Sequence, residues 1–211
     1  MSTKTNKSIK KVTSVQTPIG RFSYPFIFDP RPNNLKKVEI VVDGKKQIEL
    51  VKEYSIDILF DKETDLSKVQ EAINNAIENK FGADVPKNLR LPLKDGDVEK
   101  PTDHNYKGKL YLTAKKTYDP KNKNNIKVFI GSTKNPTQEL GSIVGGDYGV
   151  LALNFYGFDA AGNKGIGVSL EGVLLTKKGE PFSGAVPAEE IFSSYAEDVV
   201  FDEQNADLFD N

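Results

Sequence analysis

Most of the regular segments in this chain repeat with a period of two residues, the spacing of a β-strand, and one segment repeats with the spacing of a helix. The helical segment runs from Asp65 to Phe81, where apolar residues recur every three or four positions and form one stripe. Thr64 or Asp65 can cap its start, and Gly82 suits its end. Many short strands with a single helix among them predict a mainly β chain that closes into a small antiparallel barrel with long loops.

The segments before the helix include an aromatic strand and a hairpin. Residues 22–28 place Phe or Tyr at every second position, on one face of a strand, and Pro25 predicts that this strand is an edge or is broken there. We interpret these aromatic side chains as mainly core rather than as a ligand surface. Asp43-Gly44 is typical of a two-residue turn between two paired strands. Further strands are expected at residues 54–60, 107–118, 126–131, 148–158 and 165–175, with a long loop at 83–105.

The charge is distributed unevenly along the chain. Of 29 basic and 30 acidic residues, none of the basic and nine of the acidic ones lie in residues 179–211, so the first 178 residues are basic. A basic body with an acidic end is typical of nucleic-acid binding combined with an interaction tail, and a merely solvating terminus is the alternative. We predict a flexible basic arm over residues 1–17, a folded domain over 18–178 and a largely disordered acidic tail over 179–211.

Several classes of function find no support in the composition. The absence of cysteine excludes disulfides, zinc–thiolate sites and thiol catalysis. The single histidine, His104, lies in a polar segment without a nucleophile motif. Asp95 and Asp97 are a candidate cation site or carboxylate pair, but Asp-Gly-Asp is more typical of a turn. No apolar run approaches the roughly 18 residues of a membrane helix, and the basic start lacks the apolar core of a secretory signal. We expect no enzyme activity, no metal or cofactor and no membrane partner.

Basic and aromatic residues interleave along residues 107–118. By parity, Leu110, Leu112 and Ala114 form an inner face, and the outer face carries Lys109, Tyr111, Thr113 and Lys115. A ring flanked by lysines offers a stacking surface beside charges that neutralise phosphates, which is what single-stranded nucleic acid requires. The alternative is a solvated strand whose lysine stems pack on the tyrosine.

A second strand repeats this arrangement. Leu151, Leu153 and Phe155 suit the core, so Asn154, Tyr156 and Phe158 point the other way. The neighbouring loops and strands add positive charge from Lys116, Lys121, Lys123, Lys127 and Lys164. An extended basic surface of this kind attracts polyanions and makes their binding salt-dependent.

Four blocks of sequence resemble a phage single-stranded-DNA-binding protein family. They are FSYPFIFDPR at 22–31, LRLPLKDGD at 89–97, YKG with LTAK within 106–115, and NFYGFDAAGNKG at 154–165. The blocks keep the family's order and extend over roughly residues 18–185. The resemblance implies an OB-fold barrel, sequence-tolerant binding of single strands and a role in replication, with an acidic tail as in the tailed-phage replication proteins. The Asp43-Gly44 hairpin is longer than the family pattern.

These patterns and the family resemblance together predict a non-enzymatic single-stranded-DNA-binding protein of a phage replication or recombination system that acts in the cytoplasm of the infected host. They are compatible with a homo-oligomer. The predicted DNA-binding residues are Lys109, Tyr111, Lys115, Lys116, Lys121, Lys123, Asn154, Tyr156, Phe158 and Lys164, with Arg31 and Arg90 as weaker candidates. Tail residues predicted to contact a replicative polymerase or a helicase-primase are Phe201, Asp202, Glu203, Asp207, Leu208, Phe209 and Asp210. The alternatives are a virion structural or assembly protein and an enzyme acting on DNA through Asp95.

Overall fold

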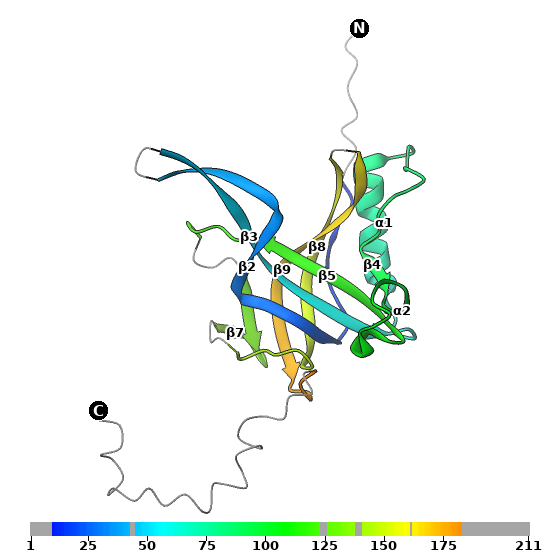
Figure 1. The fold of residues 1–211 in the computed structure, drawn as a ribbon. Helices are drawn as coiled ribbons and strands as arrows, with labels where there is room; N and C mark the ends of the chain where they lie inside the picture. The colour runs from blue at the N-terminus through cyan, green and yellow to red at the C-terminus, as the bar shows by residue number, and fades with distance from the viewer. Residues whose placement is uncertain (1–9, 43–44, 123–125, 138–140, 161, 183–211) are drawn as a thin grey trace, which may run out of the picture.

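A computed structural model of the chain describes residues 10–42, 45–122, 126–137, 141–160 and 162–182 (Figure 1). The predicted DNA contact Lys123 and all seven predicted partner-binding residues of the tail lie outside these ranges.

Within the described residues, five strands pair in a closed ring and form a barrel. Along the ring the order is β2, β3, β5, β9, β8, and the first residues of β2 pair with the start of β8 at Gly20–Gly149. The pairs are antiparallel except β5 with β9, which run parallel. This is the Greek-key order of an OB-fold, so the predicted mainly β, OB-like barrel is confirmed. The strands span Gly20–Val42 (β2), Lys45–Asp61 (β3), Lys109–Thr117 (β5), Tyr148–Ala160 (β8) and Asn163–Lys177 (β9).

Short strands extend the sheet beyond the barrel. β6 (Lys127–Ile130) pairs with β9 and with β7 (Ser132–Thr137), and β4 (Leu93–Asp95) pairs with β5. β1 (Ser14–Gln16) pairs with β8, and Lys11 just before it forms an ion pair with Glu78 of the helix. Residues 10–17 are therefore part of the fold, where the sequence had suggested a flexible arm.

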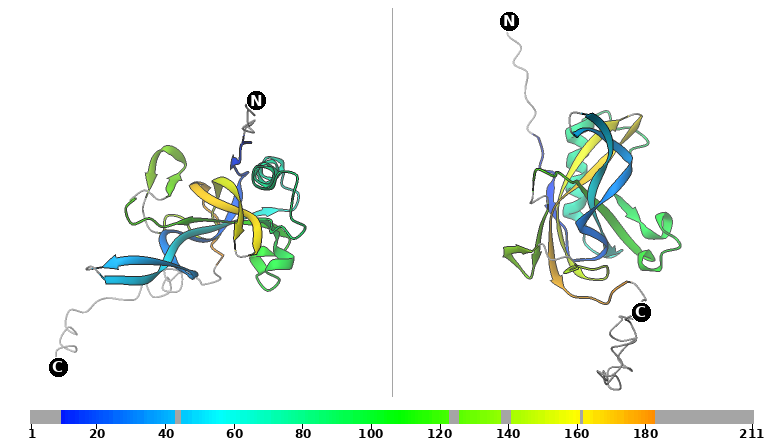
Figure 2. Two further views of the ribbon diagram at one scale, coloured as in Figure 1. Left: turned by 90° about the horizontal axis from the view of Figure 1, so that it is seen from above. Right: turned by 60° about the vertical axis from the view of Figure 1, so that its left-hand side comes forward.

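β2 and β3 continue past the barrel as a two-stranded ribbon. The pairing runs out to Val42 with Lys45, in agreement with the predicted hairpin, whose turn residues lie outside the described ranges. Figures 1 and 2 show the ribbon projecting from the barrel on the side away from α1. Leu35 and Ile48 are exposed on it.

The aromatic strand predicted at residues 22–28 forms the start of β2, but its pairing register with β3 shifts between Ser23 and Phe26. Pro25 lies inside this shift, as expected for a residue that cannot donate to the ladder. Phe22 and Ile27 are buried on either side of it, whereas Tyr24 is about half exposed. The prediction that the aromatic residues share one mainly buried face is therefore wrong at Tyr24.

The predicted helix is confirmed as α1 (Ser67–Phe81), which packs against β8 and β1 (Figure 1). Asp65 accepts a hydrogen bond from the backbone N–H of Ser67 at 2.9 Å, and Gly82 follows the helix with a φ of 57°. The buried side of α1 carries Val69 and Ile73, the stripe expected from the spacing. Across the described part of the chain, no helix combines the length and apolar character that crossing a membrane requires.

The segment expected as a loop at 83–105 contains ordered elements besides β4. A second helix, α2 (Gly96–Glu99), is capped by the carboxylate of Asp95, which accepts from the N–H of Asp97 at 3.0 Å. A short 3-10 helix, η1 (His104–Tyr106), follows and buries Tyr106. A Cβ at Gly96 would lie 2.1 Å from the carbonyl oxygen of Tyr106, so the close packing of α2 on η1 requires glycine. The expectation of a single α-helix thus omitted α2, and Asp-Gly-Asp, which was interpreted as a turn, forms the end of β4 and the capped start of this helix.

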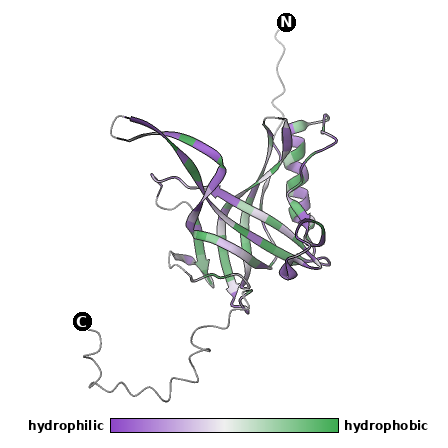
Figure 3. Cartoon of the chain, viewed as in Figure 1, coloured by the Kyte–Doolittle hydropathy of each residue, from purple (hydrophilic) through white to green (hydrophobic). Residues whose placement is uncertain are grey.

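Apolar side chains gather inside the barrel and, to a smaller extent, on its outer side. Figure 3 shows hydrophobic and hydrophilic residues interleaving along the strands. The inner cluster joins all five barrel strands to α1. A smaller cluster lies on the outer side, where Leu59, Tyr106 and Tyr111 pack together with Phe182. These residues cover part of the outer surface of the barrel, so only the rest of that surface is accessible to a ligand.

Candidate functional site

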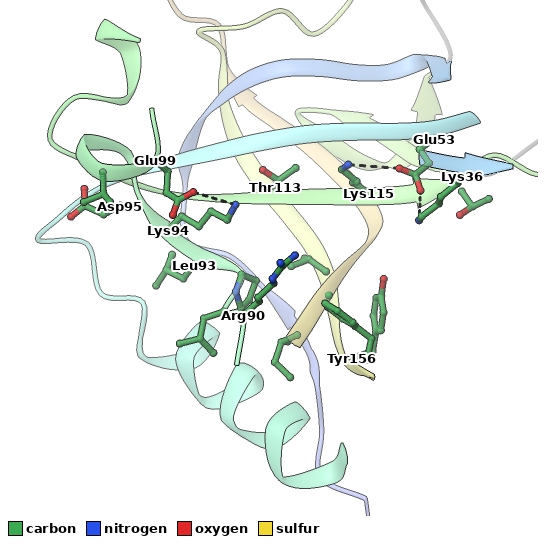
Figure 4. Close-up of a pocket in the computed structure, with 18 residues that line it drawn as sticks. Lys36, Glu53, Arg90, Leu93, Lys94, Asp95, Glu99, Thr113, Lys115 and Tyr156 are labelled. Carbon is green, nitrogen blue, oxygen red and sulfur yellow. Dashed lines mark hydrogen bonds and ion pairs between the residues drawn. The ribbon is translucent and has the colours of Figure 1, made fainter. Parts of the chain in front are cut away.

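A groove with a volume of about 830 Å³ lies on the outer side of the barrel, between β5 and the β8–β9 hairpin (Figure 4). Thr113 and Lys115 line it from β5, because they alternate with the buried residues Leu112 and Ala114. Tyr156 and Phe158 line it from β8. Residues 90–95 and α2 close one end, and Lys36 and Glu53 stand at the other.

The aromatic side of the groove depends on two glycines of β9. Tyr156 pairs directly with Gly167, and Phe158 pairs with Gly165. A Cβ at Gly167 would lie 2.4 Å from Cζ of Tyr156, and one at Gly165 would lie 2.7 Å from Cζ of Phe158. The two rings therefore lie across β9 in space that only glycine leaves free. Tyr156 remains 50 % exposed there, so its ring is available to a ligand in the groove.

The end of the groove near the β2–β3 ribbon contains a buried carboxylate between two lysines. Glu53 accepts hydrogen bonds from Lys36 at 2.5 Å and from the side-chain amide of Asn33 at 2.8 Å, and Lys115 lies 3.7 Å away. Burial raises the pKa of Glu53, but these hydrogen bonds and the two positive charges outweigh it and hold the pKa below its usual value. An ionised Glu53 thus fixes both ammonium groups at the rim (Figure 4).

At the opposite end, Arg90 contributes a positive charge that is not compensated. Its backbone is fixed to β9, since its N–H donates to the carbonyl of Lys164 at 3.0 Å and its carbonyl accepts from Ile166 at 2.9 Å. No acidic side chain among the described residues pairs with Arg90. Lys94 beside it lies 3.8 Å from Glu99. Figure 4 shows the guanidinium of Arg90 directed into the groove.

The groove brings together Lys115, Tyr156, Phe158 and Arg90 from the predicted DNA-binding set. Lys115 lines it from β5, Tyr156 and Phe158 line it from β8, and Arg90 lines it at the end closed by residues 90–95. Their contact with DNA stays a prediction.

Tyr111 is the clearest correction among the predicted residues. It lies on the same face of β5 as Thr113, as parity indicated, but only 3 % of it is exposed. Tyr106 covers it in an edge-to-face contact at 5.0 Å between ring centroids, and the ammonium of Lys100 lies 5.1 Å from its centroid. The prediction of an exposed stacking residue is wrong because residues 96–106 fold over this part of β5.

Three further predicted residues lie outside the groove lining and have other partners. Lys109, at the far end of β5, forms an ion pair with Asp61. Lys116 lies on the opposite face of β5 from Lys115 and forms an ion pair with Glu171 at 2.8 Å. Asn154 accepts hydrogen bonds from the hydroxyls of Thr13 and Ser14, which attach β1 to β8. None of the three lines the groove.

The remaining predicted residues are exposed but also lie away from the groove lining. Lys164 stands near the tip of the β8–β9 hairpin, 3.2 Å from Asp159. Arg31 lies over the ring of Phe26, with Cζ 4.8 Å from its centroid. Lys121 is exposed in the loop after β5, where its backbone N–H donates to Asp119.

Part of the lining lies outside the set of predicted residues. Lys36, Glu53 and Lys94 are not among them, although Lys94 lies in the block at 89–97 that carries the family resemblance. Lys36 reaches the groove through the irregular pairing of β2 with β3, which no local pattern reveals. Within the described ranges, no group of three or more His, Cys, Asp or Glu side chains is placed to hold a metal ion.

The sequence and the architecture of this chain are similar to those of known phage proteins. The model of the Enterobacter phage Enc34 ssDNA-binding protein family matches residues 13–203. No curated protein matches the chain. Among solved structures, the single-stranded DNA-binding protein from bacteriophage Enc34 in complex with ssDNA is 23 % identical, with a TM-score of 0.62 over 81 % of this chain and 90 % of that one.

A second solved structure with a similar fold is a protein of another phage. The crystal structure of gp2.5, a single-stranded DNA-binding protein encoded by bacteriophage T7, is 16 % identical, with a TM-score of 0.56 over 82 % of this chain and 96 % of that one. At these identities the solved structures establish a shared fold, and the match to the family model over most of the length establishes the relationship. The chain belongs to the family of the Enterobacter phage Enc34 ssDNA-binding protein.

Proposed function

We propose that this chain binds single-stranded DNA without sequence preference, in a phage replication and recombination system. The observation that carries the proposal is the groove, in which the exposed ring of Tyr156 lies opposite Lys115 and near Arg90. Bases stack on aromatic rings whatever their identity, and the cations neutralise the phosphates between them. Duplex DNA keeps its bases stacked on each other, so it gains little from these rings.

The position of the groove on the barrel supports this proposal. OB-folds bind oligonucleotides on the face of their second and third strands, between the loops that join strands one and two and strands four and five. In this chain these strands are β3 and β5, and the two loops are the β2–β3 and β8–β9 hairpins. The groove contains residues of β3 and β5 and is bounded by the β8–β9 hairpin.

The charges that line the groove suggest that electrostatic interactions contribute only modestly to DNA binding. Of the described residues lining the groove, four are cationic and three are acidic, and Lys36, Lys94 and Lys115 lie within 4 Å of an acid. A phosphate entering the groove therefore replaces a carboxylate as the partner of a lysine. We expect a logarithmic salt slope of about −2, corresponding to roughly three neutralised phosphates.

We infer binding rather than catalysis at this site. Asp95 and Asp97, the carboxylates of the enzyme hypothesis, both accept hydrogen bonds from the ammonium of Lys62, at 2.9 and 2.8 Å. Asp97 also accepts from the N–H of Gly108, and its pKa is lowered chiefly by the bond from Lys62. Both groups thus hold α2 in place.

The acidic residues beyond Gly179 suit two roles. Joined to the barrel, they compete with DNA for the groove at a high effective concentration. Once displaced by DNA, they become available to a replicative polymerase or a helicase-primase, with Phe201, Leu208 and Phe209 as apolar anchors. The cytoplasm of an infected bacterial cell is the compartment in which such partners meet, and assembly into homo-oligomers is compatible with this role.

Fluorescence anisotropy with labelled poly(dT) and with duplex of equal length tests the proposal. We expect a strong preference for the single strand and weaker binding by Lys115→Ala. Lys121→Ala is the matched control, since it removes an exposed lysine outside the groove lining. Absent binding, or equal binding of both DNAs, would favour a virion structural protein. Mg²⁺-dependent cleavage lost in Asp95→Ala would favour an enzyme.

A further inference from the structure

Tyr24 is a second exposed aromatic residue, outside the groove. Among the described residues, Tyr24 and Tyr156 are the two most exposed aromatic side chains, at 51 % and 50 %. Tyr156 lies in the proposed binding groove, whereas Tyr24 does not line it. An aromatic surface of this size next to a proposed DNA path requires an explanation.

The ring of Tyr24 is held in a fixed position. It stacks on the buried ring of Tyr106, with centroids 6.4 Å apart and an angle of 21° between the planes. Its hydroxyl donates to Asp103 at 3.0 Å, and the ammonium of Lys100 lies 5.0 Å from its centroid. One face of the ring therefore rests on protein, and the exposure shows that much of the rest faces solvent.

The backbone at Tyr24 is unusual for so large a side chain. Among the described residues, it is the only non-glycine residue with a positive φ, at 45°. Large residues rarely adopt this conformation, and such outliers concentrate at functional sites. It coincides with the register shift around Pro25, and bulges of this kind redirect side chains. The irregularity turns the ring outward, away from the core that receives Phe22 and Ile27.

Tyr24 lies on the same side of the barrel as the groove. Its neighbour Ser23 pairs with Asp57 of β3, and Asp57 pairs with Thr113, a groove residue of β5. Two strand spacings of about 4.8 Å separate Ser23 from Thr113, which is a distance that one or two nucleotides can span. Lys100 also lies along this path, where its ammonium forms an ion pair with Asp57 at 2.9 Å.

We propose that Tyr24 is a second base-stacking position, at which single-stranded DNA leaving the groove past Thr113 places one base on the exposed face of the ring. The inference rests on the proposed function, because it extends the same DNA path across β3 to β2. DNA of sufficient length would then stack a base on Tyr24, whereas a short oligonucleotide bound in the groove would not reach it.

The test compares Tyr24→Gly, Tyr24→Phe and Tyr156→Ala on dT oligonucleotides of about 5 and about 16 nucleotides, the range of site sizes known for OB-folds. Tyr24→Gly removes the ring and its contacts with Tyr106 and Asp103 but relieves the positive φ, so the protein should stay folded with only a small fall in melting temperature. It should weaken binding of the long oligonucleotide by about 5- to 150-fold, the equivalent of one lost stacking contact, and leave the short one unchanged. Tyr24→Phe should bind as the wild type does, and Tyr156→Ala should weaken both.

The outcomes separate this inference from the function itself. If the wild type binds neither oligonucleotide, the proposed function fails. If Tyr24→Gly binds the long oligonucleotide as tightly as the wild type while Tyr156→Ala does not, only the role of Tyr24 is overturned. Photo-crosslinking of 5-iodouracil oligonucleotides to the wild type is an independent measurement that needs no variant. A crosslink at Tyr24 is expected, and crosslinks confined to the groove would overturn the inference.

Discussion

The guanidinium of Arg21 lies over the ring of Phe182, with Cζ 4.3 Å from the ring centroid, and donates to the carbonyl of Glu180 at 2.7 Å. Its Nε donates to the carbonyl of Gly146 at 3.0 Å, so one side chain of β2 ties residues 180–182 to the barrel. The backbone N–H of Phe182 also donates to Gly145, and its ring packs on the outer cluster around Tyr106. The acidic tail therefore starts from a fixed point on the outer side of the barrel.

Replacing Arg21 with alanine should loosen this attachment. Two hydrogen bonds and two cation–π contacts, with Phe182 and Tyr148, are lost at a partly exposed site, so we expect a fall of about 1–2 kcal/mol in the free energy of unfolding. Hydrogen exchange at the N–H of Phe182 should accelerate. Arg31→Ala is the control, since Arg31 lies over Phe26 in a comparable way on the exposed part of β2. Unchanged exchange at Phe182 would show that Arg21 does not hold it.

A chain ending at Pro187 should bind single-stranded DNA more tightly than the full chain, with the largest gain at low salt. This truncation keeps Phe182 and its anchor but removes eight of the nine acidic residues of the tail. Because screening weakens the interaction of charges, the gain should shrink as salt rises. A full-length chain with these acids changed to their amides separates charge from length and should behave like the truncated one. Equal affinities at every salt concentration would contradict competition by the tail.

Tyr111→Ala should mainly lower the stability of the fold, whereas Tyr156→Ala should mainly weaken DNA binding. Tyr111 is buried between Tyr106 and Leu59, so its truncation should cost about 3–5 kcal/mol of the free energy of unfolding. Tyr156 is half exposed, and its truncation should change stability by no more than about 0.5 kcal/mol while weakening DNA binding by about 1–3 kcal/mol. Urea denaturation and anisotropy measure the two quantities. A stable Tyr111→Ala would contradict the packing described for the outer cluster.

The parts of the fold that the sequence predicts are those set by local spacing. The stripe containing Val69 and Ile73 predicts α1, and the alternation around Leu112 and Ala114 predicts the inner face of β5. Exposure of the outer face depends on distant segments instead. Tyr111 has the parity of an exposed residue, but residues 96–106 cover it. The bulge at Pro25 exposes Tyr24, which parity alone assigns to the core.

The dependence of stability on pH should reveal the carboxylate at the groove rim. The pKa of Glu53 is lowered from 4.5 in the folded state, so the unfolded chain takes up a proton there first as the pH falls. The stability that Glu53 contributes is therefore fully present above about pH 4.5 and is lost as the pH falls below it. Urea denaturation at pH 7 and pH 4 should show a smaller pH effect in Glu53→Gln than in the wild type. Glu39→Gln, on the exposed ribbon, controls for loss of a surface carboxylate.

Gly167→Ala should weaken DNA binding through Tyr156 rather than through the fold. The new Cβ would lie 2.4 Å from Cζ of Tyr156, so the half-exposed ring has to move off β9. Because the end of a mobile side chain gives way, we expect the free energy of unfolding to change by no more than about 1 kcal/mol. A double-mutant cycle with Tyr156→Ala isolates the effect on binding, since Gly167→Ala should cost little affinity once the ring is absent. Ala152→Gly, elsewhere on β8, is the control for a change of one methyl group on an exposed strand position. Additive losses from Gly167→Ala and Tyr156→Ala would contradict the idea that the glycine acts by positioning the ring.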